Sequence, residues 1–148
     1  MSIYDYRRRV ACYVTRTTEV GEELLVFEHA DDDPDDPAGV QVPAGGMLPF
    51  EGIEEAAHRE IEEETGLTGL AFVGQLGGVE LGIDEPGGPS MTTYVHLTAP
   101  TGGAAAWRHI VGGDGEDAGL AFDCRWEPLP LQVGLAGGQD AFLDDALA

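Results

Sequence analysis

The stretch "GGMLPFEGIEEAAHREIEEETGL", residues 45–67, places glycines, glutamates and one arginine along a segment with helical periodicity. It predicts a loop followed by a helix over residues 52–65, which Gly66 ends because glycine readily adopts the left-handed conformation at a helix C-terminus. Glutamates three and four positions apart on a helix repel one another by roughly 0.2–0.5 kcal/mol per pair. Some other interaction has to offset this repulsion.

The predicted helix carries its glutamates on two different faces. At about 100° per residue, Glu60, Glu63 and Glu64 lie on the side of the apolar stripe, whereas Glu55 and Glu62 lie opposite. Carboxylates that face the core have to be paired with cations or protonated, because isolated buried charges are very costly. Clustered oxygen ligands without histidine or cysteine suit Mg²⁺ or Mn²⁺. The alternative interpretation is a solvated acidic surface.

The spacing of the fixed residues carries a family resemblance. It matches every fixed position of the Nudix box, G-x5-E-x7-R-E-U-x-E-E-x-G-U with U aliphatic, at Gly45, Glu51, Arg59, Glu60, Ile61, Glu63, Glu64, Gly66 and Leu67. The chain therefore resembles the Nudix hydrolases over residues 45–67. The resemblance implies an α/β class chain with the Nudix fold, an α/β/α sandwich with a central mixed sheet, and a single Nudix hydrolase domain over residues 1–148.

The resemblance also implies a reaction and a set of site residues. Family members hydrolyse a phosphoanhydride bond of a nucleoside diphosphate linked to another group, X. By position, Glu60, Glu63 and Glu64 match the ligands of Mg²⁺ or Mn²⁺, joined by a backbone carbonyl near Ala44 or Gly45, and Glu51 and Arg59 match the pair that braces the loop and orients the carboxylates. The alternative is a non-catalytic nucleotide-sensing module of the same fold, although such domains usually lose box glutamates.

The box does not specify the general base. It can be a helix glutamate or an acid from a later loop, and the segment "GGDGEDAG", residues 112–119, supplies Asp114, Glu116 and Asp117. We favour Glu116 as the catalytic base, with Glu85 in "IDEPGG" as its rival. A merely solvated acidic loop is the alternative. Phe50 stands where family members commonly have glycine, so the loop before the helix is expected to differ in conformation.

The net charge of the chain limits the kinds of molecule that it is expected to bind. The chain has 28 acidic and 7 basic residues, all of them arginine, for a net charge of −21, which disfavours nucleic acid and anionic membranes. A small-molecule nucleotide then needs a local cation or a bound metal. Arg7, Arg8 and Arg9 form the one basic cluster, and strand alternation would direct Arg7 and Arg9 to one face and Arg8 to the other. A phosphate contact and surface solubilisation are the two interpretations.

The remaining features favour a soluble globular protein. At 43% hydrophobic residues the chain fits one compact domain, and no apolar run reaches membrane-spanning length or forms the core of a signal peptide, so we expect a cytoplasmic protein. Family members are often dimeric, which allows a homodimer. We expect buried free thiols at Cys12 and Cys124 and structural roles for the four histidines. Trp107 and Trp126 either stack on a nucleobase or pack in the core.

The periodicity outside the box predicts a mixed α/β chain. A hairpin or short connection is expected between the first two strands, and a short helix closes the chain at residues 139–147. The predicted strands cover residues 6–16, 23–30, 40–43, 70–82, 90–100 and 121–129.

Overall fold

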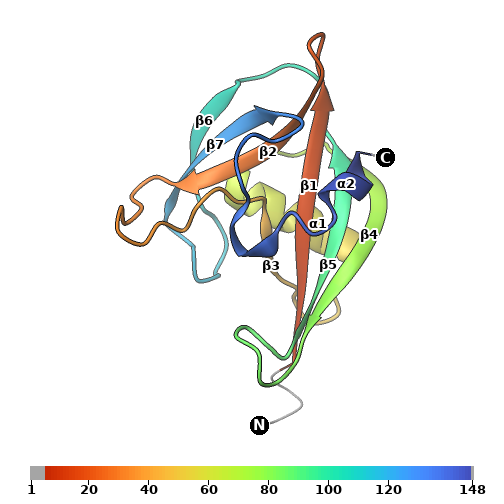
Figure 1. The fold of residues 1–148 in the computed structure, drawn as a ribbon, viewed down its shortest axis with the longest axis vertical. Helices are drawn as coiled ribbons and strands as arrows, with labels where there is room; N and C mark the ends of the chain where they lie inside the picture. Colours follow the sequence, from red (N-terminus) through yellow and green to blue (C-terminus); the bar gives the residue numbers. More distant parts are fainter. Residues whose placement is uncertain (1–5, 148) are drawn as a thin grey trace.

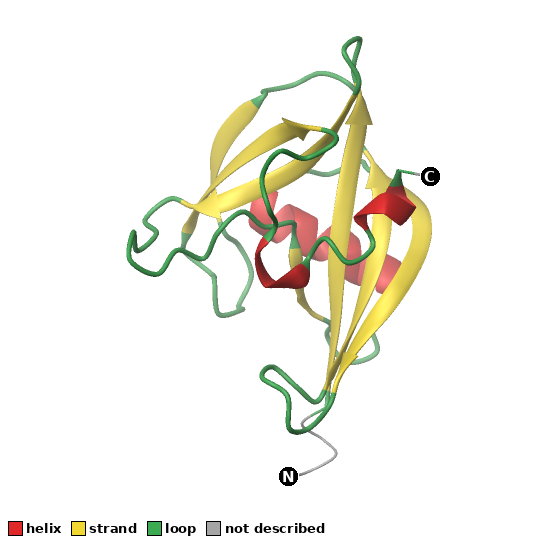
Figure 2. Ribbon diagram, viewed as in Figure 1, coloured by secondary structure: helices red, strands yellow, loops and turns green. Residues whose placement is uncertain are grey.

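Seven strands pair into one mixed sheet in the computed structural model of the chain, which describes residues 6–147. Their order is β4-β5-β1-β2-β7-β6, and β3 pairs with β1 outside this path (Figure 2). The elements are β1 Arg7–Thr17, β2 Glu22–His29, β3 Ala44–Gly46, α1 Ile53–Thr65, β4 Ala71–Leu81, β5 Ser90–Thr98, β6 Ala106–Ile110, β7 Ala121–Pro128, the 3₁₀ turn η2 Ala136–Gly138 and α2 Leu143–Ala146.

Strand β1 joins the two halves of the sheet. It runs parallel to β5 along one edge, and its other edge is shared between β3, which pairs with residues 9–11, and β2, which pairs with residues 15–17. On its other edge, β2 pairs with β7 through residues 23–29. Figure 1 shows the consequence, because β2, β7 and β6 turn away from β1, β5 and β4 while α1 lies behind them.

Alternation along β1 builds a core on each face of the sheet. Val10, Cys12 and Val14 pack with Ala56, Ala57 and Ile61 of α1, while Ala11 and Tyr13 pack with Leu143 and Ala146 of α2. Helix α1 and the C-terminal segment therefore cover opposite faces (Figure 1). The predicted α/β/α sandwich with a mixed sheet is confirmed.

Three details of the predicted elements are wrong. Strand β6, Ala106–Ile110, was not expected, because glycine and alanine precede it and only alternate residues are half-buried. The strand predicted over 40–43 falls instead on Ala44–Gly46, with isolated bridges at Val40 and Gln41. The terminal helix is limited to Leu143–Ala146. The strands predicted over 70–82, 90–100 and 121–129 are present with slightly shorter bounds.

The structure also bears on the cysteines, on membrane-spanning helices and on the extent of the domain. Cys12 and Cys124 are free and buried, as predicted. None of the helices within residues 6–147 is long and apolar enough to cross a membrane. The single domain over 1–148 stays a prediction, since residues 1–5 and 148 lie outside the described part.

Candidate active site

Helix α1 presents one face to the sheet, as the wheel predicts. It starts after Gly52 and ends at Gly66, whose φ of 81° is left-handed and whose N–H donates to the Glu62 carbonyl at 2.9 Å. Ala56, Ala57 and Ile61 of the stripe are fully buried, and Glu60 and Glu64 lie inward with them, with exposed fractions of only 7% and 5%. Glu62, on the opposite face, is exposed. The buried acids therefore follow from the packing of the helix.

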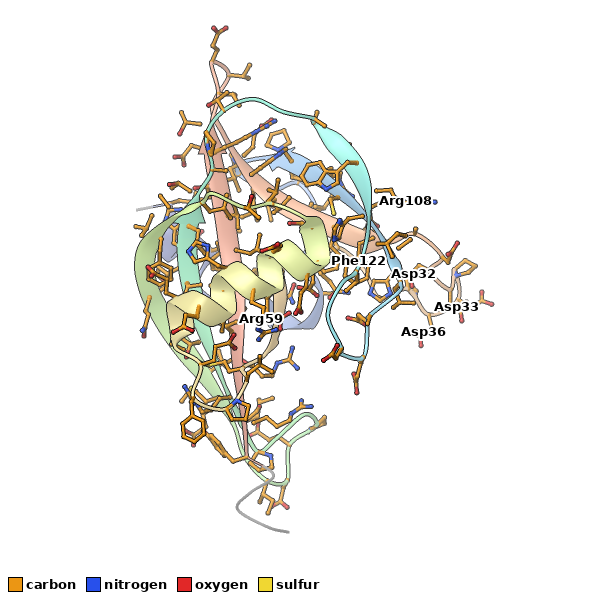
Figure 3. The ribbon with its side chains drawn as sticks, turned by 180° about the vertical axis from the view of Figure 1, so that it is seen from behind. Asp32, Asp33, Asp36, Arg59, Arg108 and Phe122 are labelled. Carbon is orange, nitrogen blue, oxygen red and sulfur yellow. The ribbon has the colours of Figure 1, made fainter. Side chains whose placement is uncertain are left out.

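Arg59 joins the loop before the helix to the inward acids. Its Nε and Nη2 donate to the two carboxylate oxygens of Glu51 at 2.7 and 2.9 Å, and Nη2 also donates to the Gly46 carbonyl at 2.9 Å. Its Nη1 donates to Glu60 at 2.9 Å and to Glu63 at 3.3 Å. The hydrogen bond from Arg59 lowers the pKa of Glu51, so this pair is held ionised. Figure 3 shows Arg59 projecting from α1.

Two glycines bring backbone directly against the carboxylates. A Cβ at Gly45 would lie 2.4 Å from the Glu60 carboxylate, and one at Gly113, whose φ is +78°, would lie 2.5 Å from Glu63 Oε1. His109 Nε2 lies 3.0 Å from the Glu63 carbonyl, which ties β6 and the following loop to the helix. Sequence reasoning missed the role of Gly113, because it missed β6; the glycine pair before the acidic loop was the available signal.

Burial disfavours the charged form of Glu60 and Glu64. It raises the pKa of Glu64 to about 9, against the stabilising N–H donated by Ala44 at 2.8 Å, and the nearby charges of Glu60 and Asp117 raise this pKa further. Burial also raises the pKa of Glu60, although Arg59 opposes the shift. Arg59 alone therefore does not neutralise this cluster.

These groups line a cleft of about 510 Å³. Its walls include Gly45 of β3, the three inward glutamates of α1, and residues 111–118. The cleft brings Glu116 together with Asp114 and Asp117, while Glu85 does not line it. Asp117 is half-buried and its charge acts on Glu64, whereas Glu116 is exposed.

The donor set of the cleft fits a hard divalent cation. Glu60, Glu63 and Glu64 offer carboxylate oxygens, with the carbonyls near Ala44 and Gly45 beside them, and these are the ligands that Mg²⁺ and Mn²⁺ prefer. No three acidic, histidine or cysteine side chains within residues 6–147 are already drawn together as a metal-binding group. Arg59 instead donates to Glu60 and Glu63.

The tryptophans are partly buried, pack against the core and do not border the acidic cleft. Trp107 Nε1 donates to the Thr65 carbonyl at 2.8 Å, and the Trp126 ring lies 4.5 Å from the Arg16 guanidinium carbon. Both contact the core on the α1 side and line a separate cavity of about 620 Å³. Core packing is therefore the interpretation that the structure favours over nucleobase stacking in the acidic cleft.

Phe50 adopts a conformation that usually requires glycine. Its φ is +64°, and its side chain is fully exposed. A left-handed phenylalanine costs roughly 1–2 kcal/mol. Phe50 therefore keeps the left-handed backbone conformation that glycine adopts freely, and this turn costs the folded state more free energy than it would with glycine.

Comparison with known proteins identifies the family. The family model described as NUDIX domain matches residues 5–130. A search of curated proteins finds no match. Three solved structures that are similar to this one have low sequence identity to the chain, so the similarity supports the fold alone.

The NUDIX domain of Shewanella oneidensis NrtR, in complex with ADP ribose, is 19% identical with a TM-score of 0.63, covering 95% of this chain and 85% of that one. RenU, a Nudix hydrolase from M. smegmatis, is 17% identical with a TM-score of 0.60, covering 93% and 81%. The C. elegans Ap4A hydrolase is 19% identical with a TM-score of 0.51, covering 65% and 70%.

Proposed function

This chain belongs to the Nudix family, and we propose that it is a metal-dependent pyrophosphohydrolase that cleaves a phosphoanhydride bond of a nucleoside diphosphate linked to another group. The observation that carries this proposal is the inward set of Glu60, Glu63 and Glu64 in one cleft beside Arg59, with Glu60 and Glu64 buried and Glu63 partly exposed. A merely structural role does not account for it, because carboxylates that are buried next to one another, as Glu60 and Glu64 are, destabilise a fold unless a cation offsets their charge.

The cofactor of this proposal is Mg²⁺ or Mn²⁺. Glu60, Glu63 and Glu64 would hold it, with the carbonyl of Ala44 or Gly45 beside them. When bound, such an ion neutralises charge on the phosphate oxygens and makes a coordinated water more acidic.

The chain's own residues position the reactants. Arg59, fixed by Glu51, holds Glu60 and Glu63 at the cleft. In the hydrolysis, the oxygen of a water bonds to phosphorus, the bridging P–O bond breaks, and the departing phosphate oxygen takes the electron pair. One proton of the water passes to a carboxylate, for which we propose Glu116, with Asp117 as the competing group in the same loop.

A substrate panel tests the reaction. Nucleoside triphosphates, diadenosine tetraphosphate, ADP-ribose and sugar nucleotides are incubated with Mg²⁺, and released phosphate or nucleoside monophosphate is measured. ADP-ribose and diadenosine tetraphosphate belong in the panel because structural neighbours of the same fold are a domain in complex with ADP ribose and an Ap4A hydrolase. We expect turnover that a chelator abolishes. Tight binding of one compound without turnover would instead indicate the nucleotide-sensing alternative.

Two further measurements test the metal and the base. A cation that binds only the folded state raises the melting temperature, so millimolar Mg²⁺ should raise the melting temperature of this protein. An unchanged melting temperature would favour an acidic surface without a metal site.

Glu116→Gln should lower kcat by about 100-fold or more if Glu116 is the base, while Glu85→Gln serves as the matched control outside the cleft. A loss in Asp117→Asn with normal turnover in Glu116→Gln would transfer the role to Asp117.

A further inference from the structure

The arginines of this chain fall into two groups. Four of the seven pair with carboxylates, namely Arg16, Arg59, Arg108 and Arg125. Within the described residues, no ion pair engages Arg7, Arg8 or Arg9, although the chain carries 28 acids. In so acidic a protein, arginines that do not pair internally are available to an external anion.

Two of these three arginines face the acidic cleft. Arg7 and Arg9 line it, and Arg8 does not. The alternation of β1 separates Arg8 from the other two, because Arg9 has the parity of Ala11 and Tyr13 on the α2 face of the sheet, and Arg8 has the parity of residues that face α1. The predicted division of the cluster is therefore present in the fold.

The edge of the sheet connects these arginines with the acids of α1. Arg9 is paired in register with Gly46 of β3, and Gly45 lies directly against the Glu60 carboxylate. A Cβ at Gly46 would meet no atom within 4 Å. Gly45 and Gly46 carry no side chains, and the same cleft is lined by these glycines, by the carboxylates and by Arg9.

The two arginines extend outward in a row. Arg9 lines the same cleft as Glu60. Arg7 lies two residues further along β1, about 7 Å away along an extended strand. A chain of phosphates that begins at the carboxylate cluster and follows β1 would meet Arg9 first and Arg7 next.

We propose that Arg9 and Arg7 form an anion subsite for phosphates beyond the diphosphate at the carboxylates, so that the preferred substrates carry a polyphosphate chain, as nucleoside triphosphates and dinucleoside polyphosphates do. The guanidinium fork matches phosphate oxygens in a bidentate manner. A sugar nucleotide, whose X is uncharged, leaves both arginines without a partner. This inference rests on the proposed function, since it assigns the substrate class of the same cleft.

Kinetics with matched arginine variants test the subsite. Arg7→Ala, Arg9→Ala, the double variant and Arg8→Ala are compared with wild type on a nucleoside triphosphate, on diadenosine tetraphosphate and on a sugar nucleotide. Losing charge-assisted hydrogen bonds should raise KM for the two polyphosphate substrates by about 10–100-fold in the double variant, with kcat little changed. KM for the sugar nucleotide should stay at the wild-type value, and Arg8→Ala should match wild type throughout. Equal effects on all substrates, or equal effects of Arg8→Ala, would overturn the inference.

A binding measurement separates this inference from the proposed reaction. Titration of inorganic tripolyphosphate in the presence of Mg²⁺ should show weaker affinity for the Arg7→Ala/Arg9→Ala variant than for Arg8→Ala. If wild type hydrolyses nothing yet this difference holds, the reaction is wrong and the subsite stands. If wild type turns over substrate but tripolyphosphate binds all variants equally, the subsite alone is overturned.

Discussion

The two faces of α1 carry the same residue type in opposite environments. Glu60 and Glu64 are buried and held by Arg59 and by the Ala44 N–H, whereas Glu55 and Glu62 are exposed. An exposed carboxylate keeps its hydration, so the outward pair costs the fold little. The inward pair is costly because its negative charge is partly desolvated. Exposed acidic residues are therefore common on this protein and cost it little, whereas the buried glutamates on the sheet-facing side of α1 are costly and call for a specific function.

The aspartate-rich loop extends the comparison beyond the helix. Asp32, Asp33 and Asp36 lie at the outer edge of the molecule, away from Arg59 (Figure 3). Asp32 accepts the N–H of Ala38 and Asp33 accepts the N–H of Asp35, so backbone donors of the loop itself bond to these two carboxylates. Solvated acids of this kind are the background against which the three inward glutamates differ.

Turnover should distinguish the two faces most strongly. Glu63→Gln or Glu64→Gln should lower kcat by on the order of 100- to 1000-fold, the range seen when a group that stabilises transition-state charge is removed. Glu62→Gln, on the exposed face, should retain wild-type kcat in the same assay. Wild-type turnover in both inward variants would end the assignment of this face as catalytic.

Removing the brace should have the next largest effect. Arg59→Ala breaks the contacts to Glu51, Gly46 and the inward acids together, and we expect activity to fall about 10–100-fold, as for residues that orient metal ligands. Because Arg59 acts through the carboxylates, the Mg²⁺ concentration for half-maximal activity should rise as well. Arg108→Ala removes an exposed ion pair with Asp123 and is the control. An activity loss with unchanged Mg²⁺ dependence would contradict the positioning role.

The neighbouring glycines of β3 offer a smaller and sharper test. A methyl group at Gly45 would meet the Glu60 carboxylate at 2.4 Å, while at Gly46 it would enter open space. Gly45→Ala should displace the Glu60 side chain and lower activity by roughly 10-fold, comparable with the disturbance of a ligand-orienting contact. Gly46→Ala should change it little. Melting temperatures of both variants check that the fold is intact, and equal activity in the two would refute the close-contact argument.

Stability without metal should respond to pH through Glu64. Its pKa rises from 4.5 to about 9 on folding, so its contribution is fully present below about 4.5 and is lost as pH rises through about 9. In chelator, wild type should therefore lose stability across this window. Glu64→Gln should lose less and, near pH 8, should be more stable by about 1 kcal/mol or more, a few degrees in melting temperature.

Thermal unfolding at several pH values in chelator measures this difference. The Glu62→Gln variant should follow the wild-type curve, since its carboxylate is exposed. A Glu64→Gln variant that is less active and yet more stable without metal is the expected signature of an acid retained for function. A Glu64→Gln curve that coincides with wild type would show that this carboxyl group titrates normally.

Much of the site can be predicted from local sequence because a helix has a fixed period. The wheel correctly separates Glu60 and Glu64 from Glu62, and Gly66 ends the helix as expected. The spacing of Glu51 and Arg59 indicates a brace, and the structure has that ion pair. These results depend on residues close in sequence, whose relative positions the helix and its adjoining loop determine.

The residues that face the glutamates across the cleft could be identified only from the tertiary structure. The pairing of β6 with β7 brings Gly113 against Glu63, and the pairing of β1 with β3 brings Arg9 to the cleft. Strand partners are chosen by contacts between distant segments, so no local period reveals them. The sequence alone determined which acids turn inward, whereas the tertiary structure decided which glycines and arginines meet them, because long-range strand pairing is settled only when the whole sheet forms.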